Sequence, residues 1–137
     1  MEAQINYSAV LIAGIAPMIV GFLWYGPLFG KLWMSLIGFS EERLNELKKR
    51  GMGRYYGIAF VAALLTAFVL AWLGKIGDAN TLLHWFQIAF WVWLGFVVTT
   101  MVDSVLWEGK SWKLYLLNIS QKFVSIFVMA IIFALWK

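Results

Sequence analysis

The sequence contains no cysteine, and this absence removes several kinds of site at once. Without thiols the chain forms no disulfide, no thiolate metal site and no cysteine nucleophile. Histidine is almost as scarce, because His84 is the only one. A zinc or haem centre needs partner ligands that the sequence around His84 does not supply, so a headgroup or loop contact is the simpler role for this side chain. We therefore predict no metal site and no cofactor.

Charge is also sparse, at 13% of 137 residues, whereas 63% are hydrophobic and the mean hydropathy is +0.80. Soluble domains carry about 25% charged residues, so this composition is typical of an integral membrane protein. Most of the 9 Trp flank apolar runs, as they do when they anchor helix ends at the level of the lipid headgroups. The net charge of +4 arises mainly beside these runs. We therefore expect the lipid bilayer to be the partner of this protein, and we expect no nucleic acid partner.

Four apolar stretches are long enough to cross a membrane. A helix of about 20 residues spans a hydrocarbon core of about 30 Å. The predicted spans cover about residues 6–25, 55–73, 82–106 and 112–136. The sequence therefore predicts an all-α fold, a four-transmembrane-helix bundle that forms a single membrane domain over residues 1–137.

The segment between the first two spans predicts two short helices. Gly26-Pro27 is expected to break the first span, and residues 27–37 then form a helix that lies in the membrane interface. A second helix is predicted over about residues 41–50, with Ser40 as its N-cap and Gly51 as its stop. Its acidic first turn and basic last turn match the helix dipole. Because only Leu44 and Leu47 are apolar, we expect the helix to face water, on the cytoplasmic side that the basic residues indicate below.

Small residues recur at helical spacing in the first two spans. Ala59, Ala63, Ala67 and Ala71 form a stripe in the second span, and Gly14 and Gly21 share one face of the first. In lipid, such stripes allow helices to approach closely, either within one chain or between copies. We expect a homo-oligomer that uses one of these surfaces.

Basic residues predict the orientation. In a four-span chain the loops after the first and third spans share one side of the membrane. They hold eight basic residues, namely Lys31, Arg43, Lys48, Lys49, Arg50, Arg54, Lys110 and Lys113, against Lys75 and Lys137 on the opposite side. The positive-inside rule then places the eight in the cytoplasm and both termini outside the plasma membrane.

Lys122 is the residue that most needs an explanation. It lies about 15 Å along the helix axis from Trp112 and about 21 Å from Trp136, near the bilayer midplane. A charge at that depth costs about 2.5–3.5 kcal/mol on insertion scales. Asp103 lies near the cytoplasmic end of the preceding span. Because side chains lean toward the N-terminus of their own helix, the carboxylate of Asp103 and the ammonium group of Lys122 should approach each other. We predict an Asp103–Lys122 pair, direct or through Asn118 or a water.

Further polar residues share the face of Lys122. Spacings of three and four residues on the fourth span, with one threonine from the third, predict a polar binding site inside the membrane. Its members are Thr99, Asp103, Tyr115, Asn118, Lys122 and Ser125. The charged pair either fixes the register of two helices or forms a site for a proton, an ion or a small ligand.

Two segments resemble a known family. One reads Trp24-Tyr25-Gly26-Pro27-Leu28-Phe29-Gly30-Lys31, followed by Trp33-Met34, and the other reads Leu106-Trp107-Glu108-Gly109-Lys110, followed by Leu117-Asn118. In these segments, and over essentially its whole length, the chain resembles a membrane protein family of bacteria and archaea known only as a domain of unknown function. Trp107 stands where that family usually has phenylalanine. The resemblance implies a small four-span membrane protein and no activity.

We predict a non-enzymatic membrane module that self-associates through its small-residue surfaces. The alternative is a small oligomeric transporter or channel that uses the polar site around Asp103, Asn118 and Lys122. An intramembrane enzyme is disfavoured, because the sequence has neither paired acids nor a nucleophile–base spacing.

Overall fold

The computed structural model describes residues 5–37, 42, 45, 46, 49 and 53–136. Within this part of the chain, four helices are long and apolar enough to cross a membrane: Tyr7–Leu28, Gly53–Ile76, Leu82–Leu106 and Trp112–Leu135. The predicted all-α bundle of four spans is confirmed. The predicted helix over residues 41–50 lies outside the described residues, apart from the four isolated positions named above.

The first span consists of α1 (Tyr7–Leu23) and a π-helical turn, η1 (Trp24–Leu28), and α2 (Gly30–Ile37) follows. The predicted break at Gly26-Pro27 is wrong, because the helix continues through both residues and ends at Phe29. In an α-helix the ring of Pro27 would clash with the carbonyl four residues earlier. The wider π turn removes that clash, and the Phe29 N–H reaches back five residues to the Trp24 carbonyl at 2.9 Å.

The second span is the uninterrupted helix α4 (Gly53–Ile76), and the fourth is α8 (Trp112–Leu135). The third span is a composite. It begins as α5 (Leu82–Val92), widens to the π-helical η2 (Trp93–Val98), and continues as α6 (Thr99–Met101) and α7 (Asp103–Leu106). The hydroxyls of Thr81 and Ser111 each accept a backbone N–H at the start of α5 and α8, at 3.1 Å.

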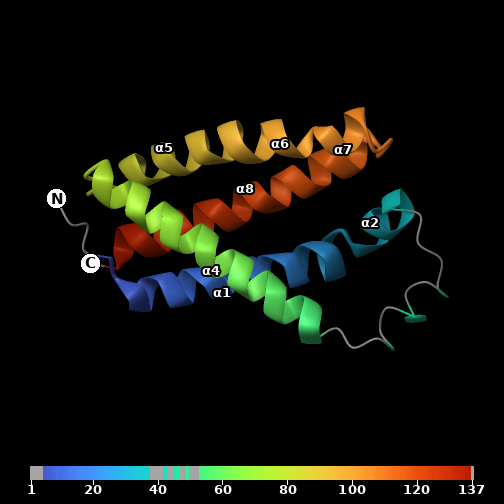
Figure 1. Cartoon of the computed structure of the whole chain (residues 1–137), viewed down its shortest axis with the longest axis horizontal. Helices are drawn as coiled ribbons and strands as arrows, with labels where there is room; N and C mark the ends of the chain where they lie inside the picture. The colour runs from blue at the N-terminus through green and yellow to red at the C-terminus, as the bar shows by residue number, and fades with distance from the viewer. Residues whose placement is uncertain (1–4, 38–41, 43–44, 47–48, 50–52, 137) are drawn as a thin grey trace.

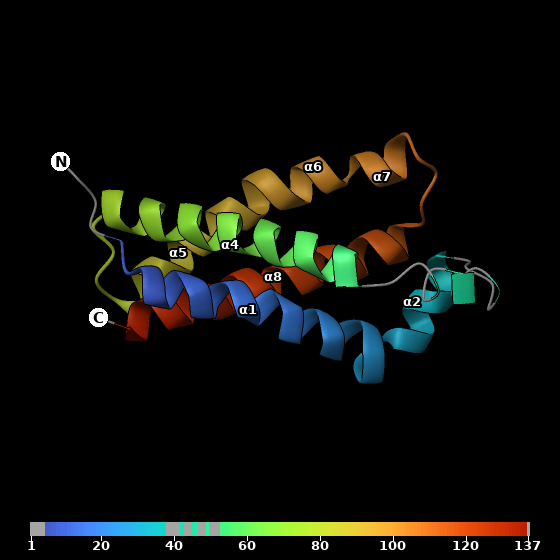
Figure 2. The ribbon, with the colours of Figure 1, turned by 60° about the horizontal axis from the view of Figure 1, so that its bottom comes forward.

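All four spans run between two ends of the molecule (Figure 1). The start of α1, the end of α8 and the turn from α4 to α5 lie at one end, whereas α2 and the turn from α7 to α8 lie at the other. From their shared turn, α4 and the stretch α5–α7 diverge toward the end that carries α2, in both views (Figures 1 and 2). The bundle is therefore closed at the terminal end and splayed at the α2 end.

The core lies toward the closed end and is rich in alanine. Because alanine is short, four helices can approach closely there. The cluster of buried residues comprises Ala9, Val10, Ala13, Ala67, Leu70, Ala71, Trp85, Ala89, Ile126, Met129, Ala130 and Phe133. The stripe predicted on the second span thus packs inside the chain, with Ala63, Ala67 and Ala71 buried and Ala59 exposed.

Candidate functional site: polar contacts along α8

The second turn of α8 is hydrogen-bonded to the end of the first span. The hydroxyl of Tyr25 donates to the side-chain oxygen of Asn118 at 2.7 Å, and the indole N–H of Trp24 donates to the backbone carbonyl of Leu117 at 3.1 Å. Both donors lie on η1. The π turn therefore aims two consecutive aromatic side chains at one turn of α8, and the predicted site residue Asn118 is held by the first span instead of the third.

The third span contacts the opposite flank of the same stretch of α8. The hydroxyl of Tyr115 donates to the Val98 carbonyl at 2.6 Å, and the indole N–H of Trp93 donates to the Ile119 carbonyl at 2.8 Å. Tyr115 is buried, and its polar end is satisfied by this bond.

Gln121 is a buried polar residue that the predicted site lacked. Its side-chain amide donates to the Ser125 hydroxyl at 3.0 Å, and both residues are only 3% exposed. A Cβ built on Gly21 of α1 would lie 3.6 Å from the amide nitrogen, so Gln121 faces the first span. The sequence did carry a signal for this residue, since Gln121 lies three residues after Asn118 and four before Ser125, on the same helical face.

Thr99 lies apart from these contacts. It is exposed, and its hydroxyl donates to the Gly95 carbonyl of its own helix. The Thr100 hydroxyl bonds the Phe96 carbonyl in the same way. Such bonds satisfy a hydroxyl in lipid without a partner helix. The structure therefore does not bring Thr99 to α8.

Asp103 and Lys122 do not form the predicted direct pair. Both side chains are exposed, and no ion pair within 4.0 Å joins them. The winding of the third span gives a reason. The π-helical η2 and the break at Val102 precede Asp103, so the side chain does not lie on the face that a regular helix would give it. The side-chain oxygen of Asn118, the predicted bridge, accepts a hydrogen bond from Tyr25 of the first span.

Lys122 occupies an unusual position on α8. It is exposed, yet it lies between Tyr115 and Met129 at steps of seven residues, and those two are 6% and 1% exposed. Seven residues are nearly two turns, so all three side chains point to the same side of α8. Met129 belongs to the core cluster, to which α1, α4 and α5 also contribute residues. At Lys122 the same side of α8 is uncovered.

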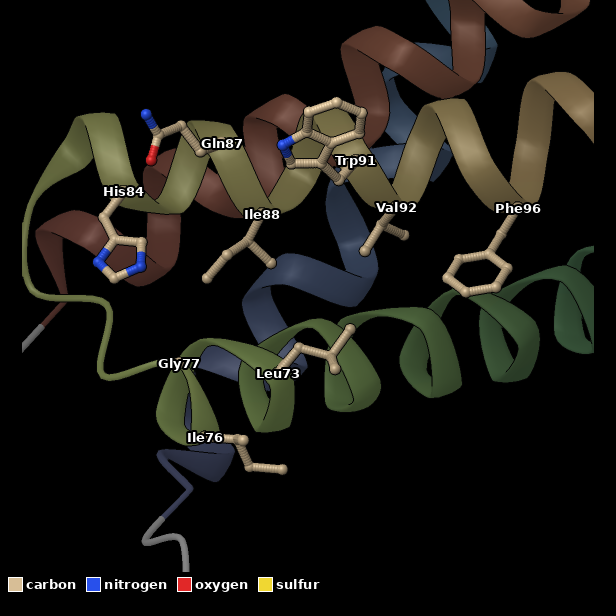
Figure 3. Close-up of a pocket in the computed structure, with 9 residues that line it drawn as sticks. All are labelled: Leu73, Ile76, Gly77, His84, Gln87, Ile88, Trp91, Val92 and Phe96. Carbon is tan, nitrogen blue, oxygen red and sulfur yellow. The ribbon is translucent and has the colours of Figure 1, made fainter.

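A groove of about 480 Å³ runs between α4 and the third span at the closed end (Figure 3). Its lining is mostly apolar and includes Leu73, Ile88, Val92 and Phe96, with His84 and Gln87 near the α4–α5 turn. The imidazole of His84 points toward α4 beside Gly77 (Figure 3). Within the described residues, no group of three or more His, Asp or Glu side chains gathers as metal ligands would.

Comparison with known proteins identifies the family. A family model described as "protein of unknown function (DUF1761)" matches residues 8–134, nearly the whole described chain. The chain belongs to the DUF1761 family. No curated protein and no solved structure matches it. The DUF1761 description assigns no activity, in agreement with the resemblance carried by the two sequence segments.

Those two segments meet in this DUF1761 chain. Trp24 and Tyr25 open the first segment, Leu117 and Asn118 close the second, and the two hydrogen bonds described above join them across 93 residues of sequence. The contact links the end of the first span to the second turn of the last. In this protein, the residues that carry the resemblance are therefore helix-packing residues.

Proposed function

We propose that this DUF1761 protein is a non-enzymatic membrane module that self-associates, and that its splayed end is the associating surface. The observation that carries the proposal is the exposure of Lys122 on a face of α8 that is buried on both sides of it along the helix. An exposed charge at this depth of a span is costly, and a second copy is the simplest means of covering it.

The surfaces that remain free in one copy support this choice of interface. The small-residue surfaces are used inside the chain: Ala63, Ala67 and Ala71 are buried, and a Cβ on Gly14 would lie 2.6 Å from Leu64 of α4. The third span, in contrast, buries only Trp85 and Ala89. Its outer face is therefore available to another copy.

The polar contacts along α8 support a packing role over a catalytic one. Tyr25, Trp93, Tyr115 and Gln121 each donate to a protein acceptor, and none of these bonds joins a nucleophile to a base. In the described part of the chain, every buried side-chain polar atom has a hydrogen-bond partner. Groups satisfied in this way hold helices in register.

A small oligomeric transporter or channel is the second candidate. It is favoured by the exposure of Lys122, since a lysine on the uncovered side of α8 would line a path between copies, one helical turn from Asn118. Four spans enclose little volume, so such a path would have to run through an assembly.

The mass of the protein in lipid nanodiscs tests self-association, and thiol labelling separates the two candidates. The chain has no cysteine, so each introduced cysteine reports one position. A packed module should leave Asn118→Cys and Lys122→Cys unreactive toward water-soluble thiol reagents in the assembled state, whereas a transporter should give continuous reactivity from Asp103→Cys to Lys122→Cys. Met129→Cys, at a buried core position, is the matched unreactive control. A single copy per nanodisc would contradict self-association.

We also propose that the protein lies in the plasma membrane with both termini outside. The two termini of the described bundle share one end with the α4–α5 turn, and the eight basic residues counted above belong to the opposite loops. In intact cells a membrane-impermeant maleimide should label Asp78→Cys in the α4–α5 turn. It should spare Lys110→Cys in the α7–α8 turn until the cells are permeabilised. The reverse pattern would mean the inverted orientation.

A further inference from the structure

We propose that Asp103 of one copy pairs with Lys122 of a second copy, so that the charged pair absent within the chain forms twice across a symmetric dimer. This inference rests on the proposed self-association and gives it a specific contact. The partner that we propose for the splayed end is a second copy of this chain, because the charges of the two copies are complementary.

The first step concerns Asp103. It is the first residue of α7 (Asp103–Leu106), and α7 lies at the splayed end of the third span (Figure 1). Its side chain is exposed there. The carboxylate is therefore free to meet a group from outside this copy.

The second step concerns Lys122. It shares the side of α8 on which Met129 is buried in the core cluster, and it lies seven residues nearer the splayed end. Its side chain is exposed there. An acid and a base are thus both exposed on one copy, without an ion pair within 4.0 Å between them. Because each copy presents both charges, the surface is self-complementary, which a twofold interface requires.

The third step concerns depth. If the twofold axis is normal to the membrane, equivalent residues of both copies lie at the same level. Asp103 lies four residues before Trp107, and Lys122 lies eleven after Ser111, so their Cα atoms differ in depth by about 10 Å at 1.5 Å per residue. Lysine leans toward the N-terminus of α8, and Asp103 leans toward the bilayer interior, so their side chains close most of this difference.

Cross-linking in the cysteine-free chain tests the contact directly. Two differently tagged copies, one with Asp103→Cys and one with Lys122→Cys, are co-expressed and treated with a short bifunctional thiol reagent. We expect a covalent dimer that carries both tags. The matched control replaces Asp103→Cys with Asp78→Cys, an exposed aspartate in the turn at the opposite end of the bundle, and should give at least about tenfold less product, as expected for a contact worth about 1.4 kcal/mol. Equal yields would overturn the proposal.

Charge swaps then separate a contact between copies from one within a copy. D103K and K122D should each weaken self-association about tenfold or more when expressed alone, since like charges then face each other. Co-expression of the two should restore it, because both contacts of the mixed dimer are again opposite in sign. If only the D103K/K122D double variant in one chain is restored, the pair is intramolecular and the proposal is wrong.

Two further outcomes have distinct meanings. If the wild-type chain is monomeric in nanodiscs, the proposed self-association fails and this inference fails with it. If the wild type self-associates while D103K, K122D and the milder K122M keep its affinity, self-association stands and the pair is excluded. Because K122M introduces no new charge, it keeps the test decisive should the charge reversals fail to insert into the membrane.

Discussion

The hydroxyl of Tyr25 lies 2.7 Å from the side-chain oxygen of Asn118 and donates a hydrogen bond to it. The two residues are 93 positions apart in sequence and belong to the first and last membrane spans. Tyr25 reaches Asn118 because η1 is a π-helical turn, which redirects the end of the first span toward α8. This bond, together with that of Trp24, ties the end of the first span to the early turns of the last one.

Removal of the Tyr25 hydroxyl should therefore weaken the bundle. We expect Tyr25→Phe to lower the free energy of unfolding by about 0.6 kcal/mol and by no more than about 1.7, the range for hydrogen bonds between membrane helices. Thermal unfolding in nanodiscs measures this, and Asn118→Leu with the double variant completes the cycle. Tyr56→Phe, at an exposed tyrosine of α4, is the control and should have no effect. Strictly additive losses in the cycle would mean that the two residues do not interact.

Trp93 should contribute more to stability than its exposed neighbour Trp91. Trp93 donates to the Ile119 carbonyl and packs edge-on against Phe123 at a centroid distance of 4.8 Å, whereas Trp91 is 66% exposed. We expect Trp93→Phe to cost about 1–2 kcal/mol through the lost bond and the volume lost beside α8. Trp91→Phe should leave the unfolding midpoint unchanged. Equal effects of the two variants would argue against the contact with α8.

The closed end should tolerate no side chain at Gly74. A Cβ there would lie 2.0 Å from the ring of Trp85, which is 4% exposed and belongs to the core. Because a buried indole cannot move away without disturbing its neighbours, Gly74→Ala should cost about 1–3 kcal/mol. Gly57→Ala on the same helix meets no atom within 4 Å and should be neutral or slightly stabilising. The unfolding midpoints of the two variants measure this difference. If Gly74→Ala were as stable as the wild type, the ring of Trp85 would not pack against Gly74.

The buried pair of Gln121 and Ser125 should behave as a unit. In Ser125→Ala the amide of Gln121 loses its acceptor and remains buried, at a cost of about 1–3 kcal/mol. The double variant Gln121→Leu with Ser125→Ala removes both polar groups and should recover most of that loss. Unfolding in nanodiscs measures the three variants, with Ser120→Ala as a control on a less buried serine. A double variant no better than the single one would show that Gln121 has another partner.

The sequence predicted the parts of this protein that depend on the membrane. The four spans follow from apolar length alone, because a helix in lipid must satisfy its own backbone and be about 20 residues long. The stripe of Ala63, Ala67 and Ala71 was predicted to allow close packing within one chain or between copies, and the structure buries it within the chain. Membership of the DUF1761 family likewise followed from two short segments, now confirmed over residues 8–134.

The errors came from positions where a helix departs from 3.6 residues per turn. Gly26-Pro27 was expected to end the first span, but the π turn carries the helix through both residues. The paths of α1 and η1 then direct Tyr25 to Asn118, a residue assigned from sequence to the charged pair. A second π-helical segment, η2, lies between Trp93 and Asp103. Each such segment shifts the faces of the residues beyond it, and single-chain periodicity does not reveal it.

The sequence by itself thus determined that the chain is a four-span membrane protein, where each span lies, and that Lys122 is a costly residue within one of them. Only the tertiary structure decided which side chains meet. It showed that α4 diverges from α5–α7, that Gln121 is buried beside Ser125, and that Asp103 and Lys122 both remain exposed. The physical reason is that hydrophobic length is a property of each segment, whereas side-chain pairing depends on the crossing and the winding of several helices together.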